Sequence, residues 1–441
     1  MNSRKIAVEI LNMVLYEGAY SNIIIRKLLN KYNVKEKDRS LITEIVYGTL
    51  KYKYKLDVIL SNLINRPFKK VDKKVLNILR ISIYQFIYLD KVPEYAIVNE
   101  AVNLAKEISI ASSKFVNGVL RAYLRNKDKN FNKEKGIVSE LAYEYSFDKW
   151  MVKLFVNQYG IERAKEILYG LNSIPSITVR INSLHWEIND VYQRLKTLNH
   201  NVEKGVVCPT SIKIIKGSNV ENNPLFSEGA ITVQDESAML AVLALEVKKN
   251  QKLLDMCAAP GGKTTHMAEL LQGSGSVLAW DLYKHKIDLI LDNAKRLGIP
   301  NIYADVSDAT VFNDKFQESF DSVLVDVPCS GLGIIRKKPE IKWTKTQKDM
   351  EALYHIQDRI LENACKYVKR GGCVVYSTCT LNVMENEKRI YKFLKKNKEF
   401  EIEKLNFAEQ TNFLYNDSGM LTILPSPDMD GFFIAKLRRK I

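Results

Sequence analysis

The stretch KLLDMCAAPGGKTTHMAELL (residues 252–271) joins a short apolar segment to a helical pattern through a loop with two adjacent glycines. A strand, a glycine-containing turn and a helix in this order form the opening of a βαβ unit. Glycines at such a turn let backbone N–H groups at the helix N-terminus approach a ligand closely. The stretch therefore predicts an α/β domain whose first loop binds a ligand.

The chain after this loop continues to alternate between strand and helix patterns. Four more apolar segments are read as strands: SVLAWD (276–281), NIYADV (301–306), DSVLVDV (321–327) and GCVVYST (372–378). Helical patterns lie between them, for example at 285–298 and 349–368. This alternation predicts a largely parallel, doubly wound, Rossmann-like sheet over residues 236–441. Such sheets bind ligands at the carboxyl ends of their strands.

Two regions of different character precede this domain. Residues 1–128 read as helices throughout, because apolar residues recur at helical spacing and glycine and proline are scarce. The polar stretch 125–136 reads as a linker. Residues 138–235 are expected to hold linker helices and a small α+β, RRM-like module, with the patterns SITVRIN (176–182), WEINDVYQRLKTL (186–198), TSIKIIKG (210–217) and GAITVQD (229–235). The expected architecture is thus multidomain.

Positive charge is concentrated in the helical region. The net charge is +15 over 441 residues. The first 130 residues hold 24 Lys and Arg against 12 Asp and Glu, whereas the remaining 311 hold 42 against 39. A basic domain of this kind favours a polyanionic partner, most simply RNA or DNA. A solvated lysine surface explains the same composition, so charge alone leaves both interpretations open.

The apolar runs and the cysteine content bear on cellular location. No apolar run is long enough to span a bilayer, and MNSRKIAVEILNMV at the N-terminus has a helical rather than a signal-peptide pattern. Six cysteines in a chain of 441 residues do not form a disulfide framework, and they are expected to be thiols in a reducing compartment. We therefore expect a cytoplasmic protein that binds no membrane. No feature of the sequence indicates an obligate oligomer, and a monomer is expected.

The glycine loop allows two ligands. GGKTT suggests the P-loop of a nucleotide hydrolase, but that motif requires glycine where Cys257 stands, and Pro260 also interrupts it. A nucleoside cofactor suits the pattern better, since Asp281 ends the second strand, where a carboxylate can accept from both ribose hydroxyls. Asp308, with Asp305 as a competing candidate, can accept from an adenine amino group. Any one of these aspartates alone is explained by a helix N-cap, but their succession favours S-adenosyl-L-methionine.

Two cysteines follow the ends of apolar strands: Cys329 in DSVLVDVPCSGLG and Cys379 in VVYSTCTLN. A thiolate that adds to carbon 6 of a pyrimidine makes carbon 5 nucleophilic and therefore open to methylation. Asp326, three residues before Cys329, is placed to stabilise charge at the ring N3. Position does not rank the two cysteines. Cys365, within a helix pattern, and Cys373, within a strand pattern, are expected to be core thiols.

Three of these segments, CAAPGGKTT, DVPCSGLG and YSTCT, together resemble the motifs of the RNA 5-methylcytosine methyltransferases and occur in that family's order. RKKPEIKW (336–343) and DGFFIAKL (430–437) fit the same family. The basic helical front, with KFVNGVLR (114–121), is similar to a NusB-type RNA-binding domain. That fusion is similar to the ribosomal RNA small-subunit methyltransferase B group, and the resemblance covers essentially the whole chain.

The resemblance implies a role for each residue of the site. Cys379 corresponds to the nucleophile that attacks cytosine carbon 6, and Cys329 to the cysteine that helps release the product. Asp326 corresponds to the residue that holds cofactor and base in a shared pocket. The cofactor loop corresponds to Cys257, Ala258, Ala259, Pro260, Gly261, Gly262 and Lys263.

The resemblance also ranks the cofactor aspartates. Asp281 matches the ribose ligand, and Asp308 matches the adenine-side aspartate better than Asp305. The family often has Asp-Ala-Arg or Asp-Gly-Arg at this point, whereas this chain has Asp308-Ala309-Thr310. That departure leaves the choice between Asp305 and Asp308 open.

The implied activity is S-adenosylmethionine-dependent methylation of cytosine C5 in 16S ribosomal RNA, within a small-subunit precursor and at the family's cytosine 967 site. The target base must leave any stack before a thiol can reach it. One alternative is a transfer RNA 5-methylcytosine methyltransferase with the same chemistry. Another is a non-catalytic RNA-binding factor with a degenerate methyltransferase domain, and a third is the P-loop hydrolase.

Overall fold

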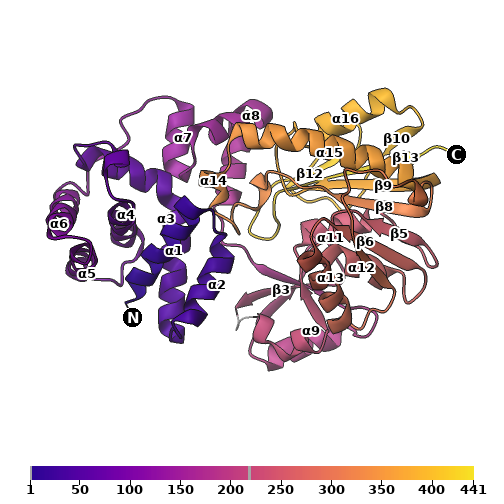
Figure 1. Ribbon diagram of the computed structural model, residues 1–441, viewed down its shortest axis with the longest axis horizontal. Helices are drawn as coiled ribbons and strands as arrows, with labels where there is room; N and C mark the ends of the chain where they lie inside the picture. The colour runs from indigo at the N-terminus through magenta and orange to yellow at the C-terminus, as the bar shows by residue number, and fades with distance from the viewer. Residues whose placement is uncertain (1, 217–219) are drawn as a thin grey trace. The chain divides into compact units, whose positions relative to one another are not determined.

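The structure, a computed structural model, describes residues 2–216 and 220–441 and divides into two compact units (Figure 1). One unit holds the chain up to residue 172 together with 335–345, and the other holds 173–334 and 346–441. Met1, the first residue of the expected N-terminal helix, and Gly217, the last residue of the strand pattern at 210–217, lie outside the described residues. None of the helices in the described part has the length and hydropathy of a bilayer-crossing segment.

The first unit is helical, as predicted. Its main helices are α1 (Ser3–Glu17), α2 (Ser21–Lys31), α3 (Glu36–Leu63), α4 (Lys73–Tyr88), α5 (Glu94–Lys106), α6 (Ile110–Arg125), α7 (Ile137–Tyr145) and α8 (Lys149–Leu171). Apolar residues from α1 to α6 form one continuous core, which the 3.6-residue period of these segments requires. The expected linker lies between α6 and α7, and α8 bends at Gly160, whose φ is 77°.

Residues 335–345, with the short helix α14 (Ile341–Thr344), belong to the helical unit although they lie far along the sequence. Lys342 is fully buried there. Its ammonium donates hydrogen bonds to the carbonyls of Lys51 and Ser146, each at 3.0 Å, and to Asn172 Oδ1 at 2.8 Å. Burial lowers the pKa of Lys342, and the three acceptors replace the water that the ammonium loses.

The second unit begins with a small α+β module, also as predicted. Its strands are β1 (Ile177–Ile181), β2 (Asn201–Lys204), β3 (Ser211–Lys216) and β4 (Ile231–Val233). They form an antiparallel sheet in the order β2-β3-β1-β4. The helix α9 (Ile188–Thr197) covers an apolar core of the module's own.

The large sheet of this unit carries the methyltransferase-like motifs. Its strands are β5 (Lys252–Asp255), β6 (Ser276–Asp281), β7 (Ile302–Val306), β8 (Phe320–Asp326), β9 (Val368–Thr378), β10 (Phe400–Glu403), β11 (Phe413–Tyr415), β12 (Leu421–Ile423) and β13 (Phe432–Arg439). The strands β5 to β9 pair in parallel, in the order β9-β8-β5-β6-β7. The strands β10 to β13 add an antiparallel edge, so the sheet is mixed rather than wholly parallel.

Alternating side chains of the parallel strands form two cores, one on each face of the sheet. The helices α11 (Glu236–Leu243), α12 (Gly262–Leu270) and α13 (Lys284–Arg296) cover one face. The helices α15 (Gln347–Tyr367) and α16 (Glu387–Lys396) cover the other, as Figure 1 shows. The domain is therefore doubly wound, and its strands β5, β6, β8 and β9 end along one edge, as the sequence predicts.

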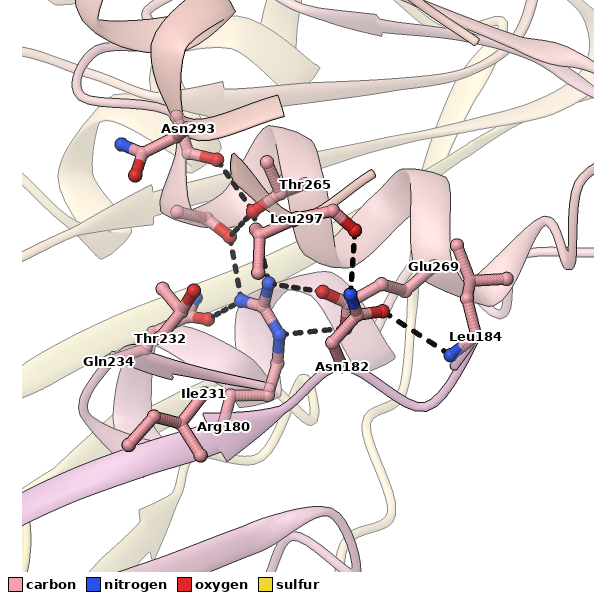
Figure 2. A network of polar contacts seen from close by, with 12 residues as sticks. Arg180, Asn182, Leu184, Ile231, Thr232, Gln234, Thr265, Glu269, Asn293 and Leu297 are labelled. Carbon is pink, nitrogen blue, oxygen red and sulfur yellow. Dashed lines mark hydrogen bonds and ion pairs between the residues drawn. The ribbon is translucent and has the colours of Figure 1, made fainter. Parts of the chain in front are cut away.

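A buried arginine connects the small module with α12, the helix that follows the glycine loop (Figure 2). Arg180, on β1, is fully buried and forms a two-pronged ion pair with Glu269 of α12, at 2.9 and 2.7 Å. The same guanidinium donates to the carbonyl of Gly262 at 2.8 Å and to Thr265 Oγ1 at 3.0 Å. Because Gly262 opens α12, Arg180 fixes the start of the helix that follows the glycine loop.

Replacing Arg180 by Met should lower the free energy of unfolding by about 3–5 kcal/mol, because Glu269 is left buried without a counter-charge. The double variant R180M/E269M should regain most of this loss, since two apolar side chains of similar volume replace the pair. Urea unfolding followed by circular dichroism measures both. Arg163 and Glu166 form a matched exposed pair, and R163M should cost less than about 1 kcal/mol. Equal losses for R180M and R163M would contradict this account.

Candidate active site

The glycine loop lies between β5 and α12 and touches the end of β6. The Ala259 N–H donates to Asp281 Oδ2 at 3.2 Å, so the loop and the predicted ribose ligand are adjacent. Gly261 has a φ of 101°, and a Cβ there would lie 3.2 Å from Ile290 Cα. Glycine is therefore required for the loop to pass α13.

The loop suits the predicted cofactor. The first turn of α12 presents backbone N–H groups, which favour a carboxylate such as that of a methionine moiety. Asp281 supplies acceptors at the neighbouring strand end, where it also pairs with Lys286 at 3.2 Å. The chemistry of these donors and acceptors fits S-adenosylmethionine.

Asp305 and Asp308, the two candidates for the adenine side, make none of the contacts described above, and both side chains are exposed. Asp305 is within β7. Asp308 follows that strand, and its Oδ1 accepts from the Thr310 N–H at 2.9 Å and the Thr310 hydroxyl at 2.7 Å. Asp308 thus closes a local turn. The role of neither residue is decided by these contacts, and the adenine-side assignment stays a prediction.

The two strand-end cysteines meet. Cys329 follows β8 and Cys379 follows β9, and these strands are parallel neighbours. Their sulfur atoms lie 3.0 Å apart, and both residues are only half-buried. A hydrogen bond with Cys379, burial and the nearby carboxylates of Glu385 and Asp326 raise the pKa of the Cys329 thiol. Cys329 is therefore a protonated thiol at neutral pH.

Asp326, at the end of β8, connects the cysteines with the cofactor loop. Its Oδ2 accepts from Lys263 Nζ at 2.6 Å, and its Oδ1 accepts from Ser377 Oγ at 2.8 Å. Burial opposes the charge of Lys263, but the Asp326 and Asp255 carboxylates raise the pKa of its ammonium on balance. A lysine–aspartate pair thus stands between the loop and the cysteine turns.

The other cysteines lie in surroundings that suppress reactivity. Cys365 and Cys373 are buried in the two cores, and burial raises the pKa of both thiols. Burial also raises the pKa of Cys208. Cys257, in the cofactor loop, has its pKa raised by burial and by the surrounding carboxylates, of which Asp255 contributes most. These thiols are poor nucleophiles at neutral pH.

Four residues near the cysteines make contacts in the site that the sequence does not indicate. The sequence places Lys263 in the cofactor loop, and it indicates no role for Ser377, Glu385 or Asn386. Their contacts join segments more than fifty residues apart, or bridge neighbouring turns, and neither leaves a periodic signal. The polar pair Glu385-Asn386, placed just before the amphipathic α16, reads as an ordinary helix start.

Asp255, beneath the cofactor loop, should give the fold a distinct pH dependence. Burial raises the pKa of its carboxyl from 3.8 to about 6, although Thr264 donates to its Oδ2 at 2.8 Å. Its Oδ1 has no hydrogen-bond partner among the described residues. Between pH 4 and 6 the folded protein retains a proton that the unfolded chain loses, so this contribution to stability falls as pH rises through that window.

The Asp255→Asn variant should lack this contribution. Relative to the variant, the wild type should lose up to about 3 kcal/mol between pH 4 and pH 7. Urea unfolding of both proteins across this range measures the difference, and other titrating groups cancel in the comparison. A difference that stays constant with pH would show that Asp255 ionises normally.

Comparisons with known proteins show which family the chain resembles along its whole length. Residues 242–438 match the family described as 16S rRNA methyltransferase RsmB/F, residues 1–125 match the NusB family, and residues 147–221 match the RsmF/B-like ferredoxin-like domain. The chain is 40% identical to the probable ribosomal RNA small subunit methyltransferase B of Bacillus subtilis, over 99% of this chain and 98% of that protein. It is 35% identical to the probable enzyme of that name from Synechocystis, over the full length of both.

Solved structures show the same architecture. The crystal structure of PH0851 superposes with a TM-score of 0.85 and 26% sequence identity, over 100% of this chain and 99% of that one. A methyltransferase homologue from Pyrococcus horikoshii has a TM-score of 0.61 and 27% identity, over 69% of this chain and all of that one. The chain therefore belongs to the RsmB/F family of S-adenosylmethionine-dependent methyltransferases, in the form that carries a NusB domain and a ferredoxin-like module.

Proposed function

We propose that the protein methylates carbon 5 of a cytosine in 16S ribosomal RNA, at the family's cytosine 967 site, through a covalent bond between Cys379 and carbon 6. The observation that carries this proposal is the pair of strand-end sulfurs 3.0 Å apart, beside an aspartate that a lysine holds. The names of the relatives in Bacillus subtilis and Synechocystis support ribosomal RNA as the substrate.

In the first step, the Cys379 thiolate forms a bond to carbon 6 of the flipped cytosine. The displaced electron pair moves toward N3, where the Asp326 carboxylate takes a proton from the Lys263 ammonium and delivers it to N3. Lys263 thus holds Asp326 in place and supplies the proton that Asp326 passes on. Carbon 5 is then the nucleophilic end of an enamine. S-adenosylmethionine, when bound, supplies an activated methyl group to this carbon.

Release of the product must remove the carbon 5 proton and break the bond to Cys379. Cys329 is suited to both tasks, because its protonated thiol contacts the Cys379 sulfur. As the carbon–sulfur bond breaks, its electrons return to Cys379, which accepts the proton of Cys329. The resulting Cys329 thiolate takes the proton from carbon 5, whose bonding electrons reform the double bond between carbon 5 and carbon 6. N3 returns its proton through Asp326 to Lys263. Both cysteines end as thiols, and deprotonation of Cys379 starts the next cycle.

The basic front domain supports RNA as the substrate. Phosphate contacts from its lysines and arginines would supply affinity that falls with salt, while the cysteine site would select the base. We infer that the substrate is a small-subunit precursor and that the enzyme acts as a monomer. The chemistry needs both cysteines reduced, which the cytoplasm provides.

Methyl transfer from labelled S-adenosylmethionine to unmodified 16S ribosomal RNA tests the proposal. We expect label in 5-methylcytidine at a single position of that RNA, located by bisulfite sequencing, and none in transfer RNA supplied alone. Label in transfer RNA instead would favour the alternative substrate. Tight RNA binding without methyl transfer to any cytosine would overturn the enzyme and favour the RNA-binding factor.

A further inference from the structure

Two consecutive residues, Glu385 and Asn386, contact the turns of both cysteines. Both side chains are fully buried in the methyltransferase domain. Neither touches a predicted ligand, and neither enters the proton transfers described above. They lie between Cys379, which follows the end of β9, and the start of α16.

Glu385 holds the turn of Cys329. Its carboxylate accepts the backbone N–H of Ser330 at 2.8 Å and the Ser330 hydroxyl at 2.5 Å. Gln357 and Asn382 donate to the same carboxylate at 3.0 and 3.1 Å. All four contacts are donated to its oxygens, which is the pattern of an ionised carboxylate with its acceptor sites satisfied. Ser330 directly follows Cys329, so this cluster fixes the backbone of that cysteine.

Asn386 holds the turn of Cys379 in the same way. The hydroxyl of Thr378 donates to Asn386 Oδ1 at 2.6 Å, and Asn386 Nδ2 donates to the carbonyl of Thr380 at 3.0 Å. These two threonines flank Cys379 on either side. One side chain therefore fixes both neighbours of this cysteine.

The hydrogen bonds around Glu385 and those around Asn386 form one connected network. The hydroxyls of Ser330 and Thr380 lie 2.8 Å apart, and because Ser330 donates to Glu385, Thr380 donates to Ser330. Tyr376, on β9, donates its hydroxyl to the carbonyl of Glu385 at 2.6 Å and so anchors the backbone of the pair. Buried networks in which every member is satisfied are rigid, and they lose that rigidity when one member is removed.

We propose that Glu385 and Asn386 form a positioning clamp that sets the distance between the Cys329 and Cys379 sulfurs. Glu385 acts on Cys329 through Ser330, and Asn386 acts on Cys379 through Thr378 and Thr380. Because Glu385 and Asn386 are adjacent in the chain, they can move little relative to each other. The turns of Cys329 and Cys379 are therefore held at a constant distance from each other. The catalytic consequence rests on the proposed function, whereas the distance itself does not.

The first test uses no RNA. Dibromobimane joins two thiols that lie close together, and mass spectrometry of the digested protein identifies a bridged Cys329–Cys379 peptide. The wild type should form this bridge, whereas Glu385→Gln and Asn386→Ala should form it at least about tenfold more slowly. Tyr367→Phe is the matched control, because it removes a part-buried hydrogen bond outside the clamp, which the Asn313 N–H donates to the Tyr367 hydroxyl at 2.8 Å. Unchanged bridging in both clamp variants, at wild-type melting temperature, would overturn the proposal.

The second test follows the protein–RNA adduct. Asn386→Ala should slow adduct formation and Glu385→Gln should slow adduct release, each by about tenfold to a hundredfold. Ser330→Ala should reproduce the slow release, and combining it with Glu385→Gln should add little, because both act on one contact. Equal slowing of formation and release in all variants, including Tyr367→Phe, would indicate general destabilisation and reject the clamp. If the wild type forms no adduct but its bridging depends on the pair, the proposed function fails and the clamp stands.

Discussion

Replacing Cys379 by Ala should abolish both methyl transfer and the denaturant-resistant protein–RNA adduct, with a loss in rate of about a thousandfold or more. Without the thiolate, carbon 5 of cytosine is not activated, and no other described group near it is a nucleophile of comparable strength. The thiol of Cys329 lies 3.0 Å away but is held protonated. Label transfer and a denaturing gel of the RNA-bound protein measure the two losses.

Cys373→Ala is the matched control for this variant. Cys373 lies on β9, the strand that directly precedes Cys379, and it is buried in the core. Its replacement by Ala should therefore leave activity near the wild-type level. An adduct that persists in Cys379→Ala would show that the nucleophile is assigned wrongly. If the adduct persists in Cys379→Ala but is absent in Cys329→Ala, the chemistry stands and the two cysteines exchange roles.

Replacing Cys329 by Ala should have the opposite effect on the adduct, which should accumulate. Cys379 can still attack and carbon 5 can still be methylated, but the proton donor to the departing sulfur is missing. General acid–base groups contribute about a hundredfold to ten-thousandfold, so turnover should fall by at least a hundredfold. Single-turnover experiments with labelled cofactor separate rapid methyl transfer from slow release.

A serine at position 329 gives this prediction a conservative comparison. Cys329→Ser keeps a proton donor of similar size but makes its conjugate base much harder to form, so release should remain slow. Cys365→Ala, which removes a thiol buried in the other core, should release product at the wild-type rate. Free turnover by Cys329→Ala without adduct would remove Cys329 from the release step.

The fold followed from local patterns because those patterns have local causes. A strand, glycine pair and helix at 252–271 specify a βαβ opening, and the later strands repeat the alternation. The antiparallel strands β10 to β13 were not predicted, since β11 and β12 have only three residues each. These short strands are held by their neighbours in the sheet, since β11 pairs with β12 and β12 pairs with β13. Pairing of this kind is not visible in a short run of residues.

In the helical unit and in the small module, too, local patterns predicted the elements but not the contacts between distant residues. The spacing of apolar residues predicted helices over the first 128 residues, and this is what the structure shows. It did not reveal that residues 335–345 belong to that unit, where Lys342 donates to three buried oxygens. Nor did alternation in SITVRIN reveal that Arg180 pairs with Glu269 of α12, because an arginine in a strand reads as a solvent-facing residue.

The sequence by itself determined the doubly wound domain, the glycine loop, and the placing of two cysteines and an aspartate at neighbouring strand ends. These features follow from the period of apolar residues and from the turn chemistry of glycine, which act over a few residues. Only the tertiary structure decided that the sulfurs lie 3.0 Å apart, that Lys263 holds Asp326, and that Glu385 and Asn386 hold the cysteine turns. Those contacts join separate turns and strand ends, and their geometry is set by packing of the whole domain rather than by any local preference.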